Sequence, residues 1–120
     1  MNSKILEERL ITFSVSVISI CRNVEKSFTG QYLSNQLVRS AISPALNYGE
    51  AQSAESLRDF IHKLKIAVKE LRESHVSLKI LKYSELIDDS RLEIAISECN
   101  ELISILVASI KSSQRRLNQS

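Results

Sequence analysis

The chain has 120 residues, which suits one domain, and 43% of them are hydrophobic, enough to bury a core. Two glycines and one proline are too few for many strands joined by tight turns, so the composition favours an all-α protein. The net charge of +2 is too small to indicate a nucleic-acid partner by itself.

The first predicted helix covers residues 2–27 and is expected to end at Thr29-Gly30. Its apolar residues recur at steps of three and four, the spacing of one helix face: Leu6, Leu10, Phe13, Val17, Ile20, Val24 and Phe28. Ser and Thr alternate through residues 12–19 and make a strand the competing interpretation, but the stripe continues on both sides and favours helix. A second apolar strip makes the apolar face wider than a monomer needs: Ile11, Val15 and Ile18.

The second predicted helix covers residues 31–50 and contains Pro44, which lacks a backbone N–H and should kink or split it. Gly49 permits a turn, although the helix can also continue through Gln52. The join to the next helix is short, so we expect the two to pack antiparallel. Polar residues gather around the kink: Arg39, Asn47, Tyr48 and Glu50. Asn47 and Glu50 lie one turn apart, so the group either fixes the helix register or forms a contact surface for a partner.

The third predicted helix covers residues 53–82, with Ser53 as its N-cap. It carries the most regular apolar stripe of the chain: Leu57, Phe60, Ile61, Leu64, Ala67, Val68, Leu71, Leu78 and Leu81. Three basic residues share another face and either form a solvated flank or contact the phosphates of a nucleic acid: Lys65, Lys69 and Arg72. Ile66 and Ile80 lie outside the apolar stripe, so with the second strip of the first helix they predict a self-association interface.

The fourth predicted helix covers residues 89–115, and residues 116–120 are expected to fray. Ser90 and Glu93 have the spacing of a capping box. The apolar stripe again follows helical spacing: Leu92, Ala95, Ile96, Cys99, Leu102, Ile103, Leu106 and Ile110. Four such stripes predict a single domain, residues 1–120, built as a four-helix bundle.

No pattern in the sequence indicates a chemical activity. His62 and His75 lie thirteen residues apart on one helix, about 20 Å along its axis, so they cannot share a metal ion. Phosphate-binding glycine loops, C-x-x-C pairs and nucleophile motifs do not occur, so we expect no enzyme, no cofactor and no metal. Cys21 and Cys99 lie in apolar stretches and read as buried thiols rather than a disulfide, which suits a reducing compartment.

The sequence also carries no pattern typical of export or membrane insertion. There is no leader-like start, and no run approaches the roughly 20 uncharged apolar residues of a membrane helix. We therefore expect a cytoplasmic protein that does not associate with a membrane.

Residues 36–74 resemble the four-helix-bundle proteins of the ribosomal RNA intervening-sequence type, which are often encoded within large-subunit ribosomal RNA genes. The matching positions occur in the order of the family pattern: Gln36, Arg39, Ser40, Asn47, Tyr48, Glu50, Ala51, Asp59, Phe60, Lys63, Ala67 and Glu70. One departure is His75-Val76-Ser77, where many members carry aromatic residues.

The resemblance implies an up-down-up-down antiparallel bundle that assembles as a homopentamer. It also implies kinship with the accessory protein of diversity-generating retroelements, a basic pentameric barrel that binds reverse transcriptase and nucleic acid. The expected function is therefore that of a non-enzymatic homo-oligomer associated with RNA or DNA. The alternative is a structural scaffold that recruits a protein partner, such as a reverse transcriptase, without binding nucleic acid.

Overall fold

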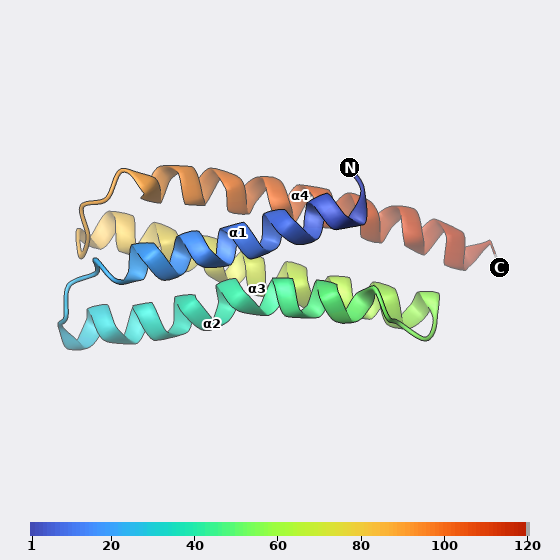
Figure 1. Cartoon of the computed structure of the whole chain (residues 1–120), viewed down its shortest axis with the longest axis horizontal. Coiled ribbons are helices and arrows are strands. Elements are labelled where there is room, and N and C mark those ends of the chain that lie inside the picture. The colour runs from blue at the N-terminus through green and yellow to red at the C-terminus, as the bar shows by residue number, and fades with distance from the viewer. Residues whose placement is uncertain (120) are drawn as a thin grey trace.

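Four long helices run alternately in opposite directions along the molecule, as Figure 1 shows. They are α1 (Ser3–Cys21), α2 (Phe28–Ala51), α3 (Leu57–Ser84) and α4 (Arg91–Asn118). This computed structural model describes residues 1–119, and that part of the chain contains no strand. The predicted all-α four-helix fold is confirmed, and the helical course of α1 through residues 12–19 settles the strand alternative in favour of helix.

The core fills the space between helices that are neighbours in sequence, and α1 also packs on α4 to close the bundle. The molecule measures 52 × 22 × 21 Å, so its longest dimension is close to that of a single 28-residue helix, about 42 Å, plus its connections. The predicted stripes supply the fully buried side chains, among them Leu10, Leu64, Leu71 and Leu106. Phe28 is an exception with 87% of its surface exposed, because it begins α2 instead of continuing the stripe of α1.

Two hydroxyl contacts fix how the helices sit against one another inside this core. Ser14 donates from its Oγ to the Ala41 carbonyl on α2 at 2.8 Å. The hydroxyls of Ser40 and Ser74 meet at 2.8 Å between α2 and α3, and both residues are fully buried. Every buried side-chain nitrogen and oxygen in residues 1–119 has a hydrogen-bond partner, so these polar atoms do not carry an unpaired desolvation cost.

The connection between α1 and α2 differs from the sequence-based prediction, since α1 ends at Cys21 and α2 begins at Phe28. Ser27 has an extended backbone and accepts a hydrogen bond from the Gly30 N–H at 3.1 Å, so it caps α2. Gly30 therefore does not stop a helix. A Cβ atom at Gly30 would lie 1.9 Å from the Glu25 carbonyl oxygen, so glycine allows the preceding loop to pass close by.

α2 runs unbroken through Pro44 to Ala51, so the proline does not split the helix, while the kink stays a prediction. Helix α3 starts at Leu57 rather than near residue 53, and its cap is Ser56, whose Oγ accepts from the Asp59 N–H at 3.0 Å. Helix α4 runs to Asn118 and so includes residues 116–118 of the predicted frayed tail, whose fraying stays a prediction, whereas Ser120 lies outside the described residues.

The predicted cap of α4 is wrong by one residue. Ser90 makes no capping hydrogen bond, and Asp89 instead accepts from the Arg91 N–H at 2.9 Å. Both Asp89 carboxylate oxygens also receive hydrogen bonds from the Arg91 guanidinium, at 3.0 and 2.7 Å. The Arg91 guanidinium in turn donates to Ser19 on α1, so this cap also holds the bundle end together.

We expect Asp89→Ala to lower the free energy of unfolding by about 1–2 kcal/mol, the usual effect of losing a helix cap. Hydrogen bonds from the side chain and backbone of Arg91 hold the pKa of the Asp89 carboxyl well below its usual range. The stability difference should therefore be complete at neutral pH and shrink as the pH falls below about 4. Ser90→Ala is the matched control, and urea unfolding of Ser90→Ala should match wild type; equal losses in both variants would contradict this assignment.

Candidate nucleic-acid interface

Basic residues on α3 form a row with a strict seven-residue spacing: Arg58, Lys65, Arg72 and Lys79. Seven residues are about two helical turns, so successive members lie on nearly the same side, about 10 Å apart along the axis. All four are exposed. Lys69, one turn beyond Lys65, is exposed beside the row, so the structure places the three predicted residues Lys65, Lys69 and Arg72 on one side of α3.

α4 adds two more basic residues beside the same side of α3. The helices run antiparallel, and the Lys82 Nζ lies 2.5 Å from the Glu93 Oε1 at one end of their contact. Lys111 follows Glu93 by eighteen residues, which is five complete turns, so it lies on the same α3-facing side of α4. Arg115 is one turn further on, and both Lys111 and Arg115 are exposed.

Where the N-terminal part of α3 meets the C-terminal part of α4, their side chains leave a shallow groove of about 220 Å³. The residues that line it include basic and amide side chains but no carboxylate: Arg58, Ile61, His62, Lys65, Gln114 and Leu117. We call the surface made by the α3 row, Lys69, Lys111 and Arg115 the cation face. Such a surface suits a polyanion, because phosphate oxygens accept hydrogen bonds from lysine, arginine and amide donors.

The cations of this face have no acidic partner in the described chain, and among the other basic residues Lys4, Arg22 and Lys26 also form no ion pair. Five basic side chains elsewhere form ion pairs: Arg9, Arg39, Lys63, Lys82 and Arg91. No residue of the cation face forms an ion pair within residues 1–119. Lys65 and Lys69, four residues apart, instead face a like charge, an arrangement that destabilises an isolated helix slightly.

The acidic residues are concentrated on other faces, which explains how a chain of net charge +2 can carry a basic surface. A groove beside the α2–α3 turn is lined by four carboxylates and only one cation: Glu7, Glu50, Glu55, Asp59 and Lys63. On the α1–α4 side, Arg9 holds Glu98 by two hydrogen bonds and lies 3.4 Å from Glu101. The total charge is therefore a poor guide to the local charge.

The predicted polar group on α2 does not form one network in the described structure. Arg39 reaches across to Glu70 at 3.0 Å and to Glu73 on α3. Asn47 donates to the Ser43 carbonyl within its own helix, whereas Glu50 accepts its hydrogen bond from Lys63 of α3.

The other two members of that group also face different surroundings. Glu50 accepts from the Lys63 Nζ of α3 at 2.8 Å. Tyr48 is buried, and this burial raises the pKa of its hydroxyl. Arg39 and Glu50 thus both tie α2 to α3, which gives these two residues a role in helix register.

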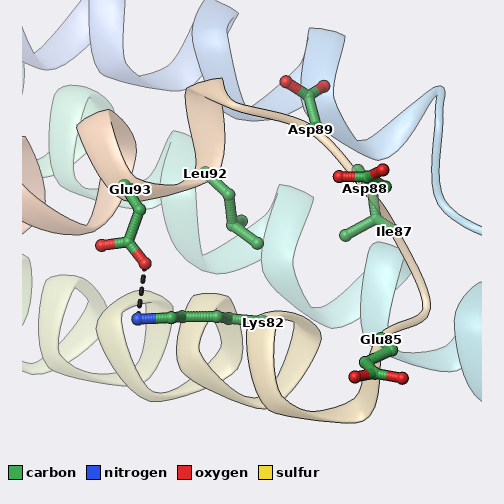
Figure 2. A pocket seen from close by; sticks show the side chains of 7 residues that line it. All are labelled: Lys82, Glu85, Ile87, Asp88, Asp89, Leu92 and Glu93. Carbon is green, nitrogen blue, oxygen red and sulfur yellow. Dashed lines mark ion pairs between the residues drawn. The ribbon is translucent and has the colours of Figure 1, made fainter.

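A pocket of about 470 Å³ lies beside the α3–α4 connection and is drawn in Figure 2. Lys82 extends across it to Glu93, while Glu85, Asp88 and Asp89 point in different directions from the connection. Asp89 is already engaged by Arg91. Within residues 1–119, no group of three or more potential metal ligands converges, here or elsewhere.

The histidines and cysteines do not form a reactive group. His62 is exposed, and burial together with the nearby Lys79 charge lowers the pKa of the half-buried His75. Cys21 and Cys99 are both buried free thiols, as predicted. Burial raises the pKa of both, that of Cys99 to about 12, so both thiols are protonated at neutral pH.

The apolar residues predicted as an interface fall on two separate patches. On α1, Ile11 and Val15 are 47% and 59% exposed, while Ile18 is half-buried. Ile11 shares a groove with Leu46 of α2, which is 61% exposed and was not recognised from the sequence. We call these four residues the α1–α2 seam.

The second apolar patch lies on α3, where Ile80 is 45% exposed and Ile66 is half-buried. We call Ile66 and Ile80 the α3 patch. In the described part of the chain α1 and α3 do not pack on each other but face each other across the bundle. The seam and the α3 patch are therefore distinct surfaces of one subunit.

Three comparisons place the chain among known proteins. A family model described as 23S rRNA-intervening sequence protein matches residues 5–108. The fold is similar to the crystal structure of a protein of unknown function from the S23 ribosomal protein family of Bacteroides thetaiotaomicron, with a TM-score of 0.83 and 29% identity. That match covers 92% of this chain and 99% of the other. No curated protein matches the sequence. No helix within residues 1–119 is long and apolar enough to cross a membrane.

Proposed function

We propose that this chain, which belongs to the 23S rRNA-intervening sequence protein family, is a non-enzymatic, self-associating protein that binds RNA along its cation face. The observation that carries the proposal is the row of four exposed α3 cations at seven-residue spacing, none of which has an acidic partner in the described chain. Lys4, Arg22 and Lys26 also lack an ion pair but lie off this face, so the support for an external anion is the gathering of seven unpaired cations on one face.

A phosphate backbone would relieve the repulsion among these cations. Its charges lie along a line, as do the cations of α3, and each contact releases a condensed counterion from the nucleic acid. DNA carries the same phosphate groups, so electrostatic contacts with the cation face do not distinguish RNA from DNA. The binding site is then a surface along two helices rather than a cavity, and it needs no cofactor or metal.

Self-association would increase the strength of such binding. A repeated assembly presents one cation face per subunit, and phosphate contacts of about 1 kcal/mol each add up through multivalency. The two apolar patches support a heterologous contact, in which the α1–α2 seam of one copy covers the α3 patch of the next. Contacts of this type close into rings. The number five is what the family resemblance implies.

A salt titration tests the RNA-binding proposal. We expect a fluorescently labelled structured RNA to bind at about 50 mM salt and to lose orders of magnitude in affinity by about 200 mM. Fluorescence anisotropy measures both values, and no binding at the lower salt concentration would contradict the proposal.

The second candidate function is a scaffold that recruits a protein partner, such as a reverse transcriptase, without binding nucleic acid. The exposed α1–α2 seam favours it, because Val15 and Leu46 present apolar surface suited to a protein contact. The two candidates differ in the salt titration, since a scaffold of this kind predicts no RNA affinity even at low salt.

A further inference from the structure

We propose that an unpaired nucleotide of the bound RNA stacks on Tyr83, at the end of the cation face formed by the C-terminus of α3. This inference rests on the proposed function, because the stacking residue is useful only where phosphates are also bound. It adds a preference for single-stranded RNA, which the cations alone do not give.

Tyr83 lies in a second α3 row beside the first, made of His62, Lys69, Val76 and Tyr83. Each member follows a cation of the first row by four residues, which places it one turn further on the same side. Tyr83 thus follows Lys79, and Val76 follows Arg72. With 73% and 56% of their surfaces exposed, Tyr83 and Val76 form an apolar end to the two α3 rows, and Glu85 of the acidic α3–α4 connection follows two residues after Tyr83.

The ring of Tyr83 is exposed and has a cation beside it. The Lys82 Nζ lies 5.3 Å from the ring centroid, within range of a cation–π contact. Lys82 is itself held by Glu93 of α4, so the neighbouring helix anchors the cation beside the ring. The helix ends at Ser84, and Glu85 takes a left-handed conformation with φ of 60°, so α3 does not continue past the ring.

The chemistry of this surface selects a single strand over a duplex. From Lys65 to Tyr83 the surface runs about 27 Å along the helix, long enough for several nucleotides. Proteins that bind single strands combine such a basic track with aromatic side chains, because every base has a flat face. Bases inside a duplex are already stacked on one another, so they cannot stack on the ring of Tyr83.

A second copy of this chain is the competing occupant of Tyr83. The unpaired cation Lys79 lies one turn from Tyr83, and Arg72 lies about 16 Å from Tyr83 along the same side of α3. Both argue for an anion instead, since an apolar patch of a second subunit would leave their charges unpaired. Ile66 and Ile80 belong to a third row of α3, which contains Glu73. Ile80 precedes Tyr83 by three residues, so this row lies next to the row of Tyr83 and roughly 100° around the helix from the first cation row. The α3 patch therefore borders Tyr83, and the light-scattering mass of Tyr83→Ala distinguishes a covering subunit from a stacked nucleotide.

The test compares Tyr83→Ala with wild type, using fluorescence anisotropy with a labelled oligouridine of about 12 nucleotides and an RNA duplex of equal length. We expect a loss of about 5- to 100-fold on the single strand, the range seen when a stacking aromatic is removed, and no change on the duplex. Tyr83→Trp should retain binding. Tyr32→Ala, which removes another exposed tyrosine on α2, is the matched control and should behave as wild type.

An abasic strand with the same phosphates provides the second arm, and wild type and Tyr83→Ala should bind it equally. Equal oligouridine affinity in Tyr83→Ala and wild type, or equal losses on single strand and duplex, would overturn the stacking proposal alone. A fall in the light-scattering mass of Tyr83→Ala would show that the ring is covered by another subunit and would also overturn it. Absence of salt-dependent binding by wild type would remove the proposed function and this inference together.

Discussion

The double variant Lys65→Glu, Arg72→Glu should bind RNA about 100- to 1000-fold more weakly than wild type at low salt. Each replacement removes a phosphate contact and adds a repulsion, and both effects are on the order of 1 kcal/mol at the protein surface. Both side chains are exposed and form no ion pair in the described chain, so the fold should not change. Anisotropy titration measures the affinity, and circular dichroism verifies the helix content.

The matched control for this variant is Lys4→Glu, Lys26→Glu. It makes the same change in net charge at two exposed lysines that lie off the cation face. A loss confined to the first variant supports a defined binding surface on α3. Equal losses in both variants would mean that RNA responds only to total charge and that the cation face is not the site.

The second large effect concerns assembly. Light scattering of wild type should give a mass near 68 kDa, five times the subunit mass of 13.6 kDa. Val15→Asp alters the α1–α2 seam, and Ile80→Asp alters the α3 patch. Each substitution removes about 1.5–3 kcal/mol of burial free energy that the apolar side chain contributes, and burying the new carboxylate in the contact costs more. Each variant should therefore be a monomer.

Mixing the two variants distinguishes the type of contact. In a heterologous assembly, the intact α3 patch of Val15→Asp can still bind the intact seam of Ile80→Asp. The mixture should therefore form a dimer near 27 kDa, twice the subunit mass of 13.6 kDa, and grow no further. If Ile80→Asp keeps the full mass while Val15→Asp dissociates, the seam binds itself and the heterologous arrangement is wrong.

Helical spacing was sufficient to predict the helices and most of the core. The stripes through Leu10, Leu64 and Leu106 are buried as expected. A step of three or four residues places side chains on one face of any α-helix, and in a bundle that face packs against the other helices. The helix ends were less predictable. Ser53 and Ser56 are equally good caps in isolation, and only the packed α2–α3 turn selects Ser56.

Other details depended on contacts between parts of the chain that are distant in sequence. Gly30 is required by the Glu25 carbonyl rather than by a helix stop, and no local pattern shows this. Asp89 displaces Ser90 as cap because Arg91 can bind it and reach Ser19 at the same time.

The cation face was only partly visible in the sequence. Lys65, Lys69 and Arg72 were recognised by their shared side, and the seven-residue spacing that adds Arg58 and Lys79 was present in the same stretch. The contribution of Lys111 required knowing which side of α4 meets α3, and the Lys82–Glu93 contact supplies it. Pairing could not be predicted, because it is the tertiary structure that gives Lys63 an acidic partner and gives Lys65 none.

The most direct test of the cation face is the slope of log affinity against log salt concentration for wild type and for Lys65→Ala, Lys69→Ala, Arg72→Ala. Each phosphate contact contributes about 0.7 to this slope on a single strand, so the triple variant should have a slope shallower by about 2. A change of this size would show that each of the three cations contacts a phosphate. An unchanged slope, at any affinity, would show that RNA does not contact this face and would contradict the account.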